Sequence, residues 1–263
     1  MQFGSLTLKC CKYGWMLFDG PYIGKCFDLY GQYSESEVAL MQGFVREGNT
    51  VIDIGANIGD LTLPLARMVG EKGSVYAVES HPDPFNVLCA NLALNGIRNT
   101  FPINAFVATS DHAETESKVW GKFAYVSEKW ATRFVALDEL PLTACHLIKV
   151  DVDGNEIEVF RSGEMQIERF RPVLYFENDL REKSAELLGF LMDLGYDLYW
   201  HLAPIFEPVN FFNNPDNHWA PRNVCSMMML GVPAERKMAV ANLPKVTTKD
   251  QWWDEKIAPE PRA

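Results

Sequence analysis

The sequence predicts a doubly wound α/β fold, in which a mostly parallel sheet of seven strands carries helices on both faces. Two observations predict this fold. Short apolar runs alternate with segments of helical periodicity along most of the 263 residues. Five of these runs end in, or are followed at once by, Asp, Glu or Asn. Because ligands bind beyond the carboxyl ends of the strands in an open α/β sheet, these polar residues mark the expected site.

The expected elements alternate along the chain. Strands 50–54 and 74–79 are apolar runs that lead into polar turns. Helix 83–95 begins among prolines, which a first turn tolerates, and ends at an Asn-Gly pair. The same patterns predict further strands at 100–107, 146–150, 172–177, 196–204 and 224–231, and further helices at 60–69, 155–161 and 181–194.

Three parts make up the expected organisation of the chain. Residues 1–48 form a leader of alternating aromatic residues and glycines, and a helix begins near Ser34 at its end. Residues 49–233 form the α/β domain. Residues 234–263 form a C-terminal arm with mixed charges and two adjacent tryptophans. We expect this arm to be partly ordered and to pack its indole rings, not to form a second domain.

The turn after strand 50–54 is the most informative segment. It contains Gly55 and Gly59, and a helical pattern follows at once. A strand that ends in glycines and opens a helix lays backbone N–H groups against a small polar ligand. Asn57 stands where dinucleotide-binding turns need a glycine for close approach to a pyrophosphate, and no Gly-Lys-Ser/Thr follows. The turn therefore favours S-adenosylmethionine, which has no phosphate, over a nicotinamide or flavin cofactor.

A carboxylate at the end of the second strand supports a nucleoside cofactor. Glu79 lies 24 residues after Gly55, close to where an acidic residue grips ribose hydroxyls in nucleotide-binding units. The glycines by themselves would fit an ordinary tight turn. Together with Glu79 they predict a cofactor that contains adenosine.

Asp151 and Glu177 are the main candidates for catalysis, because each directly follows an apolar strand. A carboxylate there orients a cofactor ammonium, holds a substrate hydroxyl or takes its proton. His201, at a late strand end, is the third candidate base. The alternatives are a helix cap for Asp151, a solvated strand end for Glu177 and a surface or core histidine for His201.

The spacing of the acidic residues and histidines does not match known metal-binding patterns. The segment 151–156 does not continue with the glycine and the glutamate that an EF-hand loop requires. The five histidines form no H-x-x-x-H pair. We therefore expect no metal, although Asp151, Asp153 and Glu177 supply carboxylates that a divalent ion would accept.

The composition limits the partners. The net charge of −11, from 35 acidic and 24 basic residues without clustered Lys or Arg, predicts that nucleic acid is not the substrate. No apolar run reaches 18 residues, so no membrane insertion is expected. Lys9 and Lys12 interrupt the N-terminal apolar residues, and six cysteines form no C-x-x-C pair, which together predict a cytoplasmic protein. A homo-oligomer is compatible with the sequence.

The motifs together resemble those of FkbM-type S-adenosylmethionine-dependent methyltransferases. The resemblance covers about residues 30–232, and the order of its blocks is as specific as any one block. Asp153 stands where the family usually has Glu, and the C-terminal arm lies outside the shared pattern. The blocks are residues 33–37, 51–59, 75–79, 91–95, 137–140, 148–156 and 171–177.

The resemblance implies a class I, Rossmann-like methyltransferase fold and O-methylation of a hydroxyl, often on a sugar or a polyketide-like product. Glu79 is then expected at the ribose, the glycine turn at the methionine part and Glu35 at the amino group. The aromatic leader and the loop 210–215 are expected to hold the acceptor, a small molecule or a glycan. The residues expected to contact the cofactor are Glu35, Asp53, Gly55, Asn57, Gly59, Glu79, Ser80, Asn104, Ala105 and Asp151.

Two other functions remain open at this point. One is a protein that binds the cofactor without catalysis. The other is a nicotinamide-dependent oxidoreductase on the same kind of fold.

Overall fold

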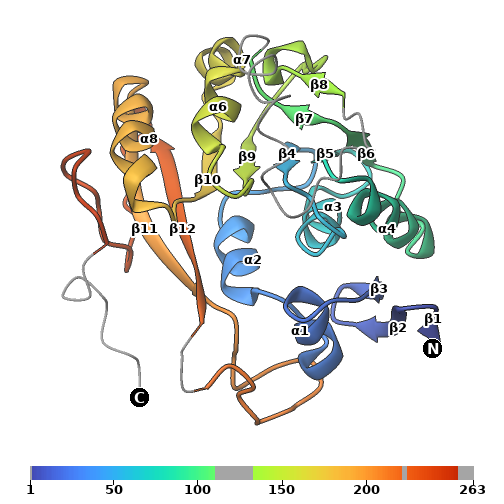
Figure 1. The fold of residues 1–263 in the computed structure, drawn as a ribbon. Helices are drawn as coiled ribbons and strands as arrows, with labels where there is room; N and C mark the ends of the chain where they lie inside the picture. Colours follow the sequence, from blue (N-terminus) through green and yellow to red (C-terminus); the bar gives the residue numbers. More distant parts are fainter. Residues whose placement is uncertain (1, 110–132, 221–223, 254–263) are drawn as a thin grey trace.

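A computed structural model describes residues 2–109, 133–220 and 224–253. Its centre is a sheet of seven strands in the order β11-β12-β10-β9-β4-β5-β6 (Figure 1). Five neighbouring strands are parallel, and β12 is antiparallel to both of its neighbours. The strands are β4 (Thr50–Ile54), β5 (Ser74–Glu79), β6 (Thr100–Asn104), β9 (Leu147–Val150), β10 (Val173–Glu177), β11 (Tyr196–Pro204) and β12 (Cys225–Pro233). The predicted fold class is confirmed.

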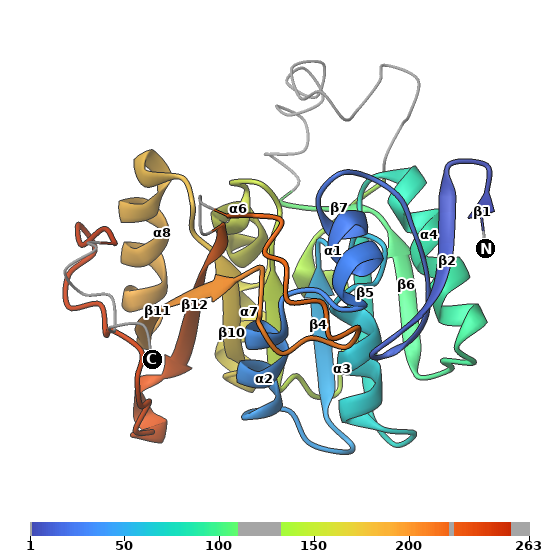
Figure 2. The same cartoon turned by 90° about the horizontal axis from the view of Figure 1, so that it is seen from below.

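Helices cover both faces of the sheet, because successive side chains of a strand point to opposite faces and the strands carry apolar side chains on both. In β4, Val51 packs toward α2 and α3, whereas Ile52 packs toward α6, α7 and α8. Figures 1 and 2 show these two layers. The helices are α2 (Glu35–Gln42), α3 (Thr62–Val69), α4 (Pro82–Leu94), α6 (Glu156–Arg161), α7 (Glu164–Phe170) and α8 (Arg181–Asp193). Of these helices, α7 was not predicted.

The predicted strand 100–107 is wrong in its extent. The strand β6 ends at Asn104, because its partner β5 ends at Glu79 and leaves no ladder to continue. The chain then forms a separate short strand, β7 (Phe106–Val107), which pairs in parallel with β8 (Phe134–Val135). A 3-10 helix follows at Leu137–Glu139.

The leader contains more structure than its sequence predicts. The strands β1 (Gln2–Phe3), β2 (Leu6–Cys11) and β3 (Gly14–Phe18) form an antiparallel sheet, and α1 (Ile23–Tyr30) follows. Two amide side chains, one in α4 and one at its C-cap, hold this sheet. Asn91 Oδ1 accepts from Leu17 N at 2.7 Å, and Asn95 Oδ1 accepts from Trp15 N at 2.9 Å. These amides satisfy the backbone of β3 as a neighbouring strand would.

The described part of the C-terminal arm runs along the outer strand β11. Trp200 N donates to Pro244 O at 2.9 Å, and Val246 N donates to Leu198 O at 2.8 Å. The indoles of Trp252 and Trp253 lie 5.5 Å and 6.0 Å from that of Trp200, measured between ring centroids. The arm therefore covers the sheet edge that β11 would otherwise expose. Among the described residues, no helix combines the length and apolar character that crossing a bilayer requires.

Candidate functional site

A cleft opens at the carboxyl ends of the central strands, as the sequence predicts. The ends of β4, β5 and β9 meet there, together with the chain that leaves β6. Five of the predicted residues line the cleft. The lining consists of Ile54, Gly55, Val78, Glu79, Ser80, Ala105, Phe106, Val107, Asp151, Val152, Asp153 and Asn155.

Gly55 allows two strand ends to approach closely. Its φ is +77°, and an added Cβ would lie 1.8 Å from the backbone oxygen of Asp151. Its N–H donates to Val78 O at 2.9 Å, so the turn is tied to β5 as well. Asn57 also has a positive φ, of 47°, which Asn tolerates better than most residues. Gly59, at φ +90°, lies against Leu88, and a Cβ there would be 2.9 Å from that side chain.

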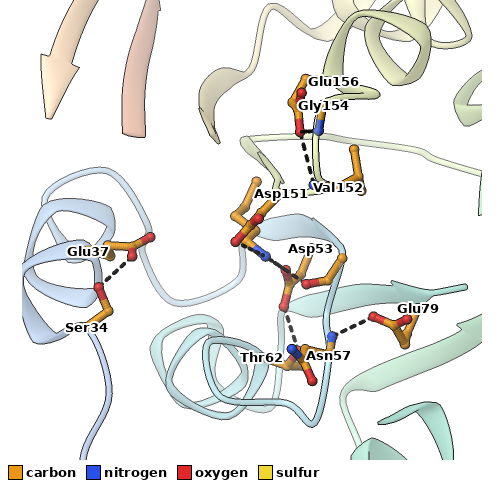
Figure 3. Close-up of polar contacts among 12 residues, drawn as sticks. Ser34, Glu37, Asp53, Asn57, Thr62, Glu79, Asp151, Val152, Gly154 and Glu156 are labelled. Carbon is orange, nitrogen blue, oxygen red and sulfur yellow. Dashed lines mark hydrogen bonds and ion pairs between the residues drawn. The ribbon is translucent and has the colours of Figure 1, made fainter. Parts of the chain in front are cut away.

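Glu79 is held by backbone donors on both sides. Its carboxylate accepts from Asn57 N at 2.8 Å (Figure 3) and from His81 N at 2.7 Å. Burial raises the pKa of Glu79, while the two N–H groups oppose the rise. Because a carboxylate offers about four acceptor positions, two remain for hydroxyl donors. Asn104 lies next to this group, and its amide nitrogen donates to Glu79 O at 2.8 Å.

A buried ion pair supports the turn from below. Asp53 is 0 % exposed, and its two oxygens face Thr62 Oγ1 at 2.6 Å and Lys149 Nζ at 3.2 Å. The same ammonium donates to Gly55 O at 2.9 Å and lies 3.7 Å from Asp151 Oδ2. Burial opposes the charge of Lys149, but Asp53 and Asp151 raise its pKa well above the usual value. Asp53 therefore lies beneath the cleft and is not among its lining residues.

The loop after β9 is shaped by a residue that the site prediction did not include. Glu156 Oε1 accepts from Val152 N at 3.1 Å and from Gly154 N at 3.0 Å. These bonds hold Asp153, with a φ of 51°, at the cleft. The sequence did contain a signal for this residue, because Glu156 is the last residue of the block 148–156 that resembles the family pattern. Within the described ranges, no three His, Cys, Asp or Glu side chains come close enough together to hold a metal ion.

Glu35 and Glu37 occupy different surroundings, although both lie in the first turn of α2. Glu35 Oε2 accepts from Lys12 Nζ at 2.6 Å and from Tyr13 OH at 2.9 Å, which ties it to the N-terminal sheet. Glu37 is 2 % exposed, accepts from Ser34 Oγ at its Oε1, and turns its carboxylate toward Asp151 (Figure 3). Burial raises its pKa to about 7. The sequence predicts Glu35, and not Glu37, as a contact of the cofactor.

Glu177 and His201 lie near the same strand ends but are not among the lining residues. Burial, and then the neighbouring carboxylates Asp151 and Asp179, raise the pKa of Glu177 well above its usual range. His201 Nδ1 is hydrogen-bonded to Tyr175 OH at 2.8 Å, and burial lowers its pKa to about 4. At neutral pH these conditions favour a protonated Glu177 and a neutral His201.

Curated relatives share short segments with this chain. One is a tRNA(Phe) (4-demethylwyosine(37)-C(7)) aminocarboxypropyltransferase of Methanocaldococcus jannaschii, 36 % identical over 77 residues, which are 29 % of this chain and 30 % of the relative. Another is the 23S rRNA (uracil(1939)-C(5))-methyltransferase RlmD of Psychrobacter arcticus, 41 % identical over 56 residues, 21 % of this chain and 11 % of the relative. The chain thus spans less than a third of the length of these relatives.

Solved structures similar to this one include further methyltransferases. An O-methyltransferase of Thermotoga maritima has a TM-score of 0.48 at 15 % identity, with 86 % of this chain and 77 % of that chain covered. A methyltransferase FkbM of Methylobacillus flagellatus has a TM-score of 0.45 at 14 % identity, with 74 % of this chain and 50 % of that chain covered.

The family comparison covers the region that builds the cleft. The family model described as the methyltransferase FkbM domain matches residues 53–198, more than half of the chain. This match confirms the predicted cofactor and decides against a nicotinamide-dependent oxidoreductase. The protein therefore belongs to the FkbM methyltransferase family and is an S-adenosylmethionine-dependent methyltransferase.

Proposed function

We propose that the protein transfers the methyl group of S-adenosylmethionine to a hydroxyl group of a small molecule or glycan, with a sugar as the favoured acceptor. The observation that carries this proposal is the position of Asp151. Its side chain is 39 % exposed and lines the cleft at the end of β9. A carboxylate that is accessible there is suited to take the proton of a hydroxyl nucleophile.

The residues of the cleft fit the cofactor. Glu79 keeps acceptor positions for the ribose hydroxyls beside its two backbone bonds. Ala105, with Phe106, offers an apolar wall for the adenine, and Asn104 fixes the chain behind it. The turn at Gly55 brings backbone close enough to contact the methionine part.

In this proposal the protein accelerates the reaction chiefly by positioning the acceptor hydroxyl against the methyl group. The bound cofactor supplies an electrophilic methyl group on a sulfonium. Holding a nucleophile in line with such a group accounts for up to about 7–11 kcal/mol of the barrier. Asp151, as the base, then contributes about 10²–10⁴-fold by accepting the hydroxyl proton at a carboxylate oxygen.

Glu177 and His201 receive supporting roles in this proposal. A protonated Glu177 donates a hydrogen bond to an acceptor oxygen and does not remove a proton. His201 holds Tyr175 OH, and Tyr175 lies close to Glu37. Asp151 is therefore the first choice as base.

Aromatic side chains support a sugar as the acceptor. The ring of Tyr22 packs edge to face against Trp219 at 5.2 Å and against Tyr33 at 6.2 Å. Burial raises the pKa of Tyr22 to about 12, and the rise includes contributions from Glu177 and Glu37, so this aromatic cluster lies within electrostatic reach of the strand ends. Aromatic faces beside carboxylates suit the apolar face and the hydroxyls of a sugar.

The loop 210–215 contributes less than the sequence suggests. The amide of Asn210 is bonded to nearby backbone. Its nitrogen donates to Glu207 O at 3.1 Å and to Asn214 O at 2.6 Å, and its oxygen accepts from Asn214 N at 2.9 Å. Phe211 and Phe212 remain exposed, at 44 % and 37 %. We assign acceptor contacts to these rings and loop packing to Asn210.

The negative charge of the protein disfavours a nucleic acid as the acceptor. The net charge is −11, and Glu79, Asp151 and Asp153 line the cleft. Carboxylates repel a phosphate backbone. The relatives named for tRNA and rRNA share at most 29 % of this chain, so an RNA acceptor is kept as an outcome of the test.

The test is a transfer assay with S-adenosylmethionine carrying a ¹³C-labelled methyl group. The acceptors are a panel of sugars, glycosides and hydroxylated natural products, with tRNA and rRNA in parallel. We expect an O-methyl resonance in a small hydroxylated product. Label found only in RNA, or on carbon or nitrogen, would overturn the proposal.

A further inference from the structure

Glu37 is a buried carboxylate with an unused oxygen beside the cleft. The residue is 2 % exposed, and Ser34 Oγ donates to its Oε1. Among the described residues, Oε2 has no hydrogen-bond partner. A buried carboxylate oxygen without a donor is costly, so such an atom points to a donor that arrives with a ligand.

The neighbouring groups do not supply that donor. Lys149 Nζ is already engaged by Gly55 O and Asp53, at 2.9 Å and 3.2 Å. The hydroxyl of Tyr175 lies within hydrogen-bonding reach of Glu37 and lowers its pKa, but it is also hydrogen-bonded to His201 Nδ1 at 2.8 Å and does not complete a bond to Oε2. Oε2 is therefore open to a further donor.

The place of Glu37 identifies the ligand group. Its carboxylate is turned toward Asp151 (Figure 3), which lines the cleft. A buried carboxylate that is turned toward a second, accessible carboxylate favours a cationic group with several N–H donors. The confirmed cofactor carries such a group on its methionine part, the α-ammonium.

We propose that Glu37 is a positioning residue that accepts a hydrogen bond from the α-ammonium group of S-adenosylmethionine at its unpartnered Oε2. Glu35, the residue that the sequence suggests for this task, also has an oxygen without a partner among the described residues, its Oε1. Its Oε2, however, is bound to Lys12 and Tyr13, so its charge is already compensated by an ammonium of the chain. The inference rests on the cofactor and not on the acceptor, so it stands or falls separately from the proposed O-methylation.

Two ligands that differ only in the tail isolate this contact. S-Adenosylhomocysteine carries the ammonium, whereas 5′-methylthioadenosine has the same adenosine and sulfur without it. Isothermal calorimetry measures both on the wild-type protein, Glu37→Gln and Glu35→Gln. For Glu37→Gln we expect about tenfold or greater weakening of S-adenosylhomocysteine binding, in line with charge-assisted hydrogen bonds, and a change under about twofold for methylthioadenosine.

Unchanged methylthioadenosine binding also shows that the variant is folded around the cleft. If Glu37→Gln itself fails to fold, Glu37→Asp gives the same comparison with the charge retained and its reach shortened. Equal losses for both ligands, or a loss for S-adenosylhomocysteine in Glu35→Gln and none in the Glu37 variants, would overturn the assignment.

Discussion

Lys149 Nζ lies 3.2 Å from Asp53 Oδ1, and both side chains are almost completely buried under the glycine turn. The same nitrogen donates to Gly55 O, so one ammonium joins β9, β4 and the turn. The relationship links the stability of the domain to the shape of the cofactor cleft.

Replacing Lys149 with Met should strongly destabilise the protein. It leaves the carboxylate of Asp53 buried and unpaired, which costs about 3–5 kcal/mol in comparable buried pairs. Urea unfolding of the wild type and of Lys149→Met measures the free energy of unfolding. The double variant Asp53→Asn with Lys149→Met should recover part of the loss, and a loss below 1 kcal/mol in the single variant would contradict the prediction.

Gly55→Ala should impair the cleft more than an alanine at another positive φ. A Cβ at position 55 meets the backbone oxygen of Asp151, which cannot move without displacing β9. Gly48 also has a positive φ, of +84°, but an added Cβ there meets nothing within 4 Å. Gly48→Ala should therefore cost only about 1–2 kcal/mol from backbone strain, and Gly55→Ala distinctly more.

Denaturant unfolding and S-adenosylhomocysteine titration measure both effects. We expect the affinity to fall only in Gly55→Ala. Equal stability losses in the two variants, with affinity retained in both, would show that the close approach to Asp151 is unimportant.

Glu79→Gln should weaken cofactor binding by about tenfold to a hundredfold. The amide keeps the shape of the side chain but gives up charge and acceptor positions at the ribose, and hydrogen bonds to charged groups contribute about 1.5–3 kcal/mol. Calorimetry with S-adenosylhomocysteine measures the change. The matched control is Glu71→Gln, an exposed glutamate before β5, which should bind as the wild type does.

Asp151→Asn separates binding from turnover. The variant keeps the loop backbone but loses the carboxylate proposed to take the acceptor proton, so kcat should fall by about 10²–10⁴-fold. Affinity for S-adenosylhomocysteine should fall far less than kcat does, because Glu37, and not Asp151, is the proposed hydrogen-bond partner of the ammonium. Normal turnover in Asp151→Asn would transfer the role of base to another group.

Glu37 should make the stability of the ligand-free protein depend on pH. Burial raises its folded pKa from 4.5 to about 7, with Asp151, Lys149 and Tyr175 also acting on it. The folded state then binds the proton more tightly than the unfolded state, so stability falls as pH rises from about 4.5 to 7. The integrated loss is on the order of 3–4 kcal/mol.

Glu37→Gln removes this titration. Without ligand, the melting temperature of the variant relative to that of the wild type should therefore be higher at pH 8 than at pH 5. With saturating S-adenosylhomocysteine at pH 8, the wild type should instead have the higher melting temperature, because the ammonium of the ligand compensates the charge of Glu37. A difference between the two proteins that is independent of pH would contradict this account.

The sequence by itself determined the α/β fold class and the edge of the sheet that holds the site. Its patterns depend on local spacing, since apolar runs that end in Asp53, Glu79 or Asp151 place these residues at the carboxyl ends of strands in any parallel sheet. The glycine turn could also be predicted, because a missing side chain is visible in the sequence.

Only the tertiary structure decided contacts between segments far apart in the chain. Glu35 and Glu37 are both acidic and lie two positions apart, so they point from different sides of α2, and packing alone turns Glu37 toward Asp151. The backbone of β3 is bonded by Asn91, 74 positions away from Leu17, which no local pattern reveals. Asp53 lies one residue before the end of β4, whereas Glu79 is the last residue of β5, and the alternation of side chains along β4 directs Asp53 toward Thr62 beneath the turn.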